Sequence, residues 1–239
     1  MLQPKRPPAP GRGWLIERRR VSGATDIAQT YNVVRVTISE PAQTGTETLE
    51  AGARKTAFEH PPFLDAVLTD ARVAAAIRGE RHQFRSRLDG LLQAIRLMVQ
   101  TDAFLALAAY RLRVRLNARG IPVLPWIAHR VAIVAGQISI ADTAVVHPGV
   151  YIPHGQVVIH GAVEIQPFVT LLPWVTVGPI GRDLAGPKIG ATAVIGTGAK
   201  VLGDIEVGAG ARVGTNAVVL DDVPPNTTVV GMPAQPVAD

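Results

Sequence analysis

The 239-residue chain contains no cysteine, which excludes disulfides, thiolate metal sites and a cysteinyl-acyl intermediate. It also lacks any apolar run near the roughly 20 residues that a membrane-spanning helix needs. The N-terminus is basic and proline-rich, without the apolar segment of a signal peptide. We therefore expect a cytoplasmic protein that does not contact a membrane.

Aromatic residues are scarce, at 5% of the chain, whereas hydrophobic residues make up 47% and there are 23 glycines and 19 prolines. Few rings, many aliphatic side chains and frequent turns favour a thin repeat structure over a globule with one thick core. The net charge is +5, and its excess lies before residue 130, which suits an anionic ligand. Because no nucleic-acid recognition motif accompanies these charges, we predict no nucleic-acid partner.

Three segments follow one another along the sequence. Residues 1–60 are basic, polar and proline-rich, and we expect a flexible extension there, with a short strand possible at 31–38. Residues 61–137 carry apolar residues at helical spacing and predict a helical domain. Examples of that spacing are Leu88, Leu91, Leu92, Ile95 and Val99. Residues 138–239 follow a different period.

In this third segment an aliphatic residue returns at every sixth position. A period of six fits neither a helix, with 3.6 residues per turn, nor an alternating strand that ends in hairpins. It predicts short strands joined by tight turns, three to a triangular coil, with the aliphatic residues stacked inside. The repeated aliphatics are Ile140, Val146, Ile152, Ile159, Ile165, Leu171, Val177, Ile189, Ile195, Val201, Val207, Val213 and Val219.

The repeat is interrupted at two places. One residue is added between Ile152 and Ile159, and the stretch GPIGRDLAGPK replaces or extends a repeat between Val177 and Ile189. Extruded loops in repeat proteins often build sites on one face, so both interruptions are candidates for functional positions.

Several stretches are similar to one family. FLALAAYRL (Phe104–Leu112) resembles that family's last long helix, and the chain from Pro187 to Ala234 resembles its C-terminal half, ending in VPPNTTVVGMPA. Over roughly residues 100–236 the chain resembles serine O-acetyltransferases, within the hexapeptide-repeat acyltransferases. The resemblance implies a mainly β fold, a left-handed parallel β-helix preceded by a helical domain. It also implies acetyl-CoA as co-substrate and a small hydroxyl-bearing acceptor.

The resemblance places the catalytic histidine of that family at His154, in PHG before the strand VVI. Histidine suits the role of general base because its unperturbed pKa of about 6.5 lies near working pH. An ungapped match places Ser139 where the family has an orienting aspartate. His160 is a second candidate base, and His147 is interpreted as a structural turn residue. Asp142 and Glu164 are candidate substitutes for the missing orienting aspartate.

The resemblance also places a CoA-binding groove along small residues of the repeat. Ala199 and Ala217 are eighteen residues apart and should stack on adjacent coils. Lys200 can reach a phosphate or remain solvated. The predicted CoA-binding set is Gly178, Ala199, Lys200, Ala217, Gly231 and Pro233. We see no cluster of metal ligands and predict no metal.

The chain departs from the family where the acceptor would bind. The aspartate that precedes the catalytic histidine is Pro153 here, and Ala-Gly stands where the family's loop has Arg-His. Arg182 and Asp183 are candidate replacements for the lost polar contacts. Trp174 stands where the family carries a small or polar residue, and can reshape the acceptor pocket or pack against another subunit. Because a desolvated ammonium or carboxylate needs a partner, these changes argue against L-serine as the assured acceptor.

Three functions stay open. The chain is an O-acetyltransferase for serine or a related small molecule, a sugar or amine acetyltransferase on the same scaffold, or a catalytically degenerate CoA-binding or scaffold paralogue. The resemblance implies a homotrimer or a dimer of trimers. The C-terminus lacks the isoleucine with which the family engages its sulfhydrylase partner, so we predict no such complex.

Overall fold

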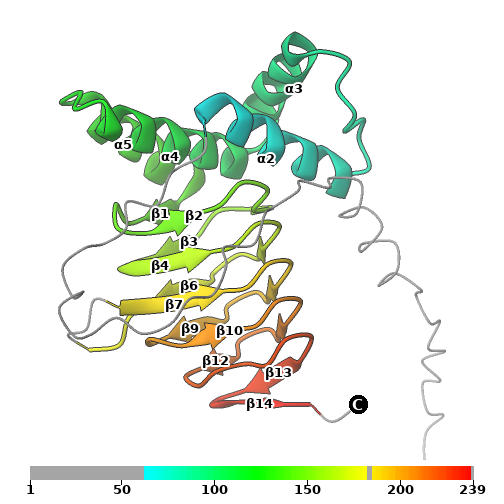
Figure 1. The fold of residues 1–239 in the computed structure, drawn as a ribbon, viewed down its shortest axis with the longest axis vertical. Coiled ribbons are helices and arrows are strands. Elements are labelled where there is room, and N and C mark those ends of the chain that lie inside the picture. Colours follow the sequence, from blue (N-terminus) through cyan, green and yellow to red (C-terminus); the bar gives the residue numbers. More distant parts are fainter. Residues whose placement is uncertain (1–61, 182–184, 238–239) are drawn as a thin grey trace, which may run out of the picture. The chain divides into compact units, whose positions relative to one another are not determined.

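A computed structural model describes residues 62–181 and 185–237 (Figure 1). In these ranges a group of helices is followed by short strands that wind into a parallel β-helix. The possible strand at 31–38 and the rest of the predicted N-terminal extension lie outside the described residues. None of the described helices is long and apolar enough to cross a membrane.

The helices begin where the sequence offers suitable N-terminal residues. The first follows Pro62, and the second is capped by the Ser86 hydroxyl, which accepts a hydrogen bond from the backbone N–H of Asp89 at 3.1 Å. Pro125 lies in the first turn of the last helix, where its missing N–H costs nothing. The four are α2 (Phe63–Ile77), α3 (Arg87–Gln100), α4 (Asp102–Ala118) and α5 (Leu124–Gly136).

The predicted apolar spacing of α3 does not mark its buried face. Gly90, Ala94 and Leu97 are the residues of this helix that are buried. Four of the residues that suggested the helix are exposed by 48–83%, and Leu91 by 37%. Two of the three buried residues are small, and at Gly90 the neighbouring side chains leave no room for a larger one. An added Cβ there would lie 2.8 Å from the side chains of Leu68 and Phe84.

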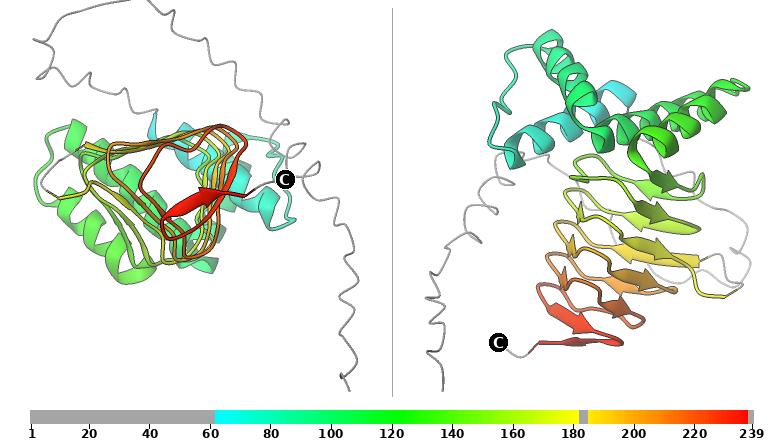
Figure 2. Two further views of the ribbon diagram at one scale, coloured as in Figure 1. Left: turned by 90° about the horizontal axis from the view of Figure 1, so that it is seen from below. Right: turned by 180° about the vertical axis from the view of Figure 1, so that it is seen from behind.

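The strands form three sheets, which are the three sides of the coil (Figure 2). Sheet A has the order β1-β3-β6-β9-β12, sheet B the order β10-β7-β4-β2, and sheet C the order β14-β13-β11-β8-β5. All pairs are parallel except the terminal β13·β14 hairpin. The bounds are β1 (Ile138–Ile140), β2 (Val145–Val146), β3 (Val157–Ile159), β4 (Ala162–Ile165), β5 (Thr170–Leu171), β6 (Thr176–Gly178), β7 (Ala185–Ile189), β8 (Val194–Ile195), β9 (Lys200–Leu202), β10 (Glu206–Val207), β11 (Arg212–Val213), β12 (Val218–Val219), β13 (Thr228–Gly231) and β14 (Ala234–Pro236).

The aliphatic residues at every sixth position form the core of the coil. Each of them is at most 6% exposed, and they belong to one continuous buried cluster. Burying a side chain of this size contributes roughly 1.5–3 kcal/mol, so the repeated stack is a major source of stability. The structure thus confirms helices followed by a parallel β-helix of six-residue repeats.

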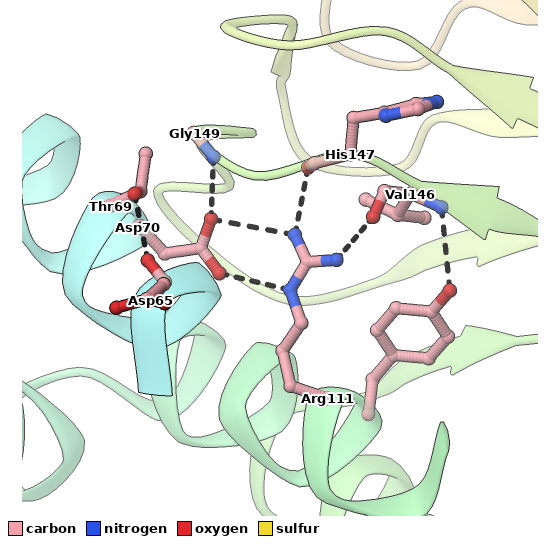
Figure 3. A network of polar contacts seen from close by, with 8 residues as sticks. Asp65, Thr69, Asp70, Arg111, Val146, His147 and Gly149 are labelled. Atoms are coloured by element: carbon pink, nitrogen blue, oxygen red, sulfur yellow. Dashed lines mark hydrogen bonds and ion pairs between the residues drawn. The ribbon is translucent and has the colours of Figure 1, made fainter. Parts of the chain in front are cut away.

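Helix α4 contacts the first coil of the β-helix through three polar side chains. The first coil has no preceding coil to bond its backbone carbonyls, and Arg111 supplies donors instead. Its Nη1 donates to the carbonyl of Val146 and its Nη2 to the carbonyl of His147, the latter at 2.8 Å (Figure 3). Tyr110 donates to the carbonyl of Ala144 at 3.1 Å. Nη2 of the third side chain, Arg113, donates to a carbonyl of β1 at 2.5 Å.

A buried carboxylate on α2 completes this junction. Asp70 accepts from Arg111 Nε at 3.1 Å, and the backbone N–H of Gly149 donates to Asp70 Oδ1 at 2.7 Å (Figure 3). Both charged side chains are at most 5% exposed. A buried ion pair is tolerated when its remaining hydrogen-bonding atoms are satisfied, as they are here for Asp70. The pair therefore joins two helices to the start of the β-helix.

Candidate active site at one corner of the β-helix

The chain turns from sheet C into sheet A at a corner that we call the C–A corner. It is built by four residues at equivalent positions of successive coils, all with left-handed backbone torsions. Their φ values are 67° for Gln156, 67° for Trp174, 76° for Gly198 and 57° for Asn216. Strand register aligns them, since Val158, Thr176, Lys200 and Val218 pair in sequence across sheet A.

His154 lies on this corner, two residues before Gln156. Its turn follows the isolated bridge at Tyr151 and precedes β3, and its side chain is exposed. The next residue, Gly155, lies against the end of α5. A Cβ at position 155 would be 1.7 Å from the carbonyl oxygen of Gly136. The C-terminal end of α5 therefore fixes the backbone that carries the imidazole.

Ser139, the counterpart of the orienting aspartate, is half-buried in β1 and pairs with Val158 of β3. No hydrogen bond joins its hydroxyl to His154 in the part of the chain that the structure describes. The two candidate substitutes are engaged elsewhere. Asp142 pairs with Arg113 at 3.1 Å, and Glu164 pairs with His147 at 3.2 Å. Within one protomer, neither carboxylate orients His154.

The three histidines of the first coils lie at different corners of the β-helix. His147 follows β2 at the turn from sheet B to sheet C, where it pairs with Glu164. His160 follows β3 at the turn from sheet A to sheet B and is exposed. Only His154 of these three lies on the C–A corner, which separates it from its predicted competitor.

The two alanines of the predicted CoA groove lie on the C–A corner, on adjacent coils. The pairing of Lys200 with Val218 places Ala199 directly beside Ala217. Both alanine side chains point into the coil and are 0% exposed. A ligand in this groove would therefore meet their backbone, while the methyl groups pack the core.

The other predicted CoA-binding residues are spread over a wider region. Gly231 is the last residue of β13, and the pairing of β13 with β11 places it beside the C–A corner. Pro233 lies in the terminal hairpin. Gly178 lies at the other end of β6, with His160 3.3 Å from where a Cβ would be. Lys200 Nζ donates to the carbonyl of Trp174 at 2.7 Å.

Two of the four predicted acceptor residues lie in the described part of the chain. Pro153 and Trp174 belong to the C–A corner, and Pro153 also lines a small depression of about 20 Å³ together with Arg78, the residue after α2. Arg182 and Asp183 lie outside the described residues. In the sequence they stand between β6, which ends at Gly178, and β7, which begins at Ala185.

No family model matches the chain. A soybean serine acetyltransferase structure is 31% identical with a TM-score of 0.62, and the match covers 74% of this chain and 70% of that one. The chain belongs to the serine acetyltransferase-like acyltransferases. It shares the helical N-terminal domain and left-handed β-helix of that family, which confirms the predicted fold class.

Two further members of the family are similar. A curated serine acetyltransferase from Synechocystis sp. is 40% identical over 135 residues, which are 55% of this chain and 54% of the relative. The chain thus spans about half the length of that curated relative. A structure titled as a serine acetyltransferase complex with CoA is 28% identical with a TM-score of 0.60, covering 73% of this chain and 69% of that one.

Sequence reasoning missed the residues that connect the helices to this family's β-helix. Asp70, Arg111 and Gly149 are separated by up to 79 positions along the chain, and no periodicity relates them. The available signal was the Tyr-Arg pair within FLALAAYRL, where two polar groups interrupt a row of small apolar residues. Buried polar residues of this kind are hydrogen-bonded as a rule, so this pair was a usable signal of a polar junction.

Proposed function

We propose that the chain transfers an acetyl group from acetyl-CoA to the hydroxyl of a small acceptor, with His154 as general base. One observation carries this proposal: in a chain of this family, an exposed histidine lies on the same corner as the stacked alanines of the predicted CoA groove. The similarity to a serine acetyltransferase in complex with CoA supports the co-substrate.

The reaction requires one base and one stabilised oxyanion. A neutral alcohol is a poor nucleophile, so the His154 imidazole takes the hydroxyl proton as the acceptor oxygen attacks the thioester carbonyl carbon. Backbone N–H groups of a turn can stabilise the negative charge that develops on the carbonyl oxygen. The carbon–sulfur bond then breaks, and the imidazolium returns the proton to the CoA thiolate. Because the chain has no cysteine, transfer is direct, without a cysteinyl-acyl intermediate.

Ser139 is the proposed orienting residue. Its oxygen can accept an N–H from the imidazole, but it carries no charge to stabilise an imidazolium. In serine proteases with a Ser-His-Asp triad, losing the function of the carboxylate lowers kcat by about 10⁴-fold. We therefore expect turnover with any acceptor to be slower than in an enzyme that has an aspartate at this position.

The proposed groove for acetyl-CoA runs down the C–A corner from His154. The backbone at Ala199 and Ala217 would border the pantetheine arm, with Gly231 and Pro233 toward the nucleotide end. Gly178 and Lys200 complete the proposed set. To reach a phosphate, the ammonium of Lys200 would have to break its hydrogen bond to the Trp174 carbonyl. Its contribution to CoA affinity therefore needs a direct binding measurement.

We propose a homotrimer, or a dimer of trimers, which is the assembly that the resemblance implies. Packing of three-sided coils around a threefold axis would place the sides of neighbouring protomers against one another. This arrangement is part of the proposal.

The deciding experiment measures thiol release from acetyl-CoA with serine, homoserine, sugars and amines as acceptors. Changing His154→Ala should lower kcat by about 10²–10⁴-fold, the usual contribution of a general base. The matched control is His160→Ala, an exposed histidine at another corner, which should leave kcat within twofold. Release that survives in the His154 variant would refute the proposed base.

The other two candidate functions have distinct outcomes in the same assay. Turnover with amines but not alcohols would favour an amine acetyltransferase. CoA binding without turnover on any acceptor would favour a degenerate CoA-binding or scaffold paralogue.

A further inference from the structure

Trp174 is the one large aromatic side chain on the described C–A corner. It is 57% exposed and comes one coil after His154 and one coil before Ala199. The residues at equivalent positions of the next two coils are Gly198 and Asn216, both well suited to a left-handed backbone. A tryptophan with a φ of 67° is unfavourable there, so its side chain is not explained by the needs of the turn.

The backbone beneath the indole is firmly held. Lys200 Nζ donates to the Trp174 carbonyl at 2.7 Å, and the N–H of Gly198 donates to the carbonyl of Pro173 at 2.9 Å. Both contacts come from the following coil. The indole is therefore presented from a fixed main chain, between the proposed base and the proposed CoA groove.

The charged side chains that border this region in the described ranges already have partners. Lys200 is bound to the Trp174 carbonyl. Arg78, which lines the depression beside Pro153, is paired with Glu80 at 2.9 Å. Pro153 and Gln156, the described neighbours on the turn of His154, are uncharged. A zwitterionic acceptor would find no free opposite charge among these groups, and an unpaired buried charge is expensive.

We infer that Trp174 is a specificity-determining residue whose indole stacks against an acceptor with an uncharged ring face that bears the reactive hydroxyl. This inference rests on the proposed function. Aromatic side chains bury large apolar areas and favour flat partners, so they recognise rings in ligand sites. A sugar ring and an aryl or alicyclic alcohol both offer this chemistry, whereas free serine does not.

The test compares acceptors and variants in one set of assays. Methyl β-D-glucopyranoside and benzyl alcohol represent the two sources of a neutral ring, and L-serine represents the zwitterion. We expect one ring acceptor to be acetylated with at least tenfold higher kcat/KM than L-serine. Trp174→Asn, which installs the residue found at position 216 of the same corner, should raise KM for that acceptor at least tenfold. KM for acetyl-CoA should stay within twofold.

The conservative variant Trp174→Phe keeps an aromatic face and should restore KM to within about threefold of the native value. A merely structural role would instead change both KM values or the thermal stability together. L-serine as the preferred acceptor, with unchanged KM in Trp174→Asn, would overturn the inference. So would a loss of trimer mass in light scattering without a change in KM, because Trp174 would then be an interface residue.

A binding measurement separates this inference from the proposed function. The chain contains three tryptophans, and ring acceptors should quench fluorescence in the native protein but not in Trp174→Phe. If quenching persists in His154→Ala and no variant shows turnover, the ring-binding site is supported and the proposed base is refuted. No Trp174-dependent quenching by either ring compound, together with turnover on serine, would refute the ring-binding site alone.

Discussion

At the scale of single residues, a glycine decides where the candidate base lies. Gly155 follows His154, and its Cα faces the carbonyl oxygen of Gly136 at the end of α5. Gly136 is itself confined, because an added Cβ would lie 2.5 Å from the Cβ of Ala106 on α4. The contact of α4 with Gly136 and the contact of Gly136 with Gly155 thus fix the position of the turn that carries His154.

The first prediction concerns this contact. Changing Gly155→Ala should destabilise the protein by about 1–3 kcal/mol, because backbone on both sides must move to admit a methyl group. The matched control is Gly178→Ala, where the nearest atom to the new Cβ is 3.3 Å away. Urea denaturation measures both. Equal stability of the two variants would show that α5 does not hold the turn tightly.

At the scale of elements, α4 and α5 share a joint that contains a titratable group. His129 of α5 accepts a hydrogen bond through Nδ1 from Arg113 Nη1 of α4 at 2.6 Å. Burial lowers the pKa of His129, and the charge of Arg113 lowers it further, with Arg130 adding to the effect and Asp142 opposing it. The neutral imidazole therefore fits this joint, and the protonated form is repelled by the guanidinium.

This joint predicts a loss of stability in acid. Since the folded-state pKa of His129 is below its unfolded value, about 6.5, the unfolded chain takes up the proton first as the pH falls. The contribution is complete above about pH 6.5 and declines as the pH falls through the folded pKa. His129→Asn keeps an acceptor without titrating, so the difference in Tm between pH 7.5 and pH 5.5 should shrink. An unchanged difference would assign the acid sensitivity to other groups.

At the scale of the whole described molecule, the buried pair of Asp70 and Arg111 unites helices and β-helix. Removing one member leaves the other charge buried without compensation, which typically costs about 3–5 kcal/mol. The exposed pair of Arg87 and Asp65, separated by 4.0 Å, provides a contrast, since exposed pairs contribute at most about 1 kcal/mol.

We therefore expect Asp70→Asn to lower the free energy of unfolding by about 3–5 kcal/mol, and Arg87→Ala by at most about 1 kcal/mol. Chemical denaturation measures both, and far-UV circular dichroism reports whether the helices melt before the β-helix. Similar costs for the two variants would mean that the junction is held by apolar packing instead.

The sequence by itself determined the repeat architecture. Interior residues of the β-helix recur every six positions because each short strand buries one side chain at the same depth. The period can therefore be detected from nearby residues alone. The same regularity predicted that Ala199 and Ala217 would stack, whereas the family resemblance singled out His154. None of these required knowledge of distant contacts.

Tertiary structure alone decided which candidates share a surface. The family resemblance ranked His154 above His160 and His147, and the three-sided coil places the three histidines at three different corners. The junction of Asp70 with Arg111, and the approach of Gly136 to Gly155, depend on how helices cross the first coil. Those contacts join residues far apart in the chain. Their geometry follows from side-chain packing, which leaves no periodic pattern in the sequence.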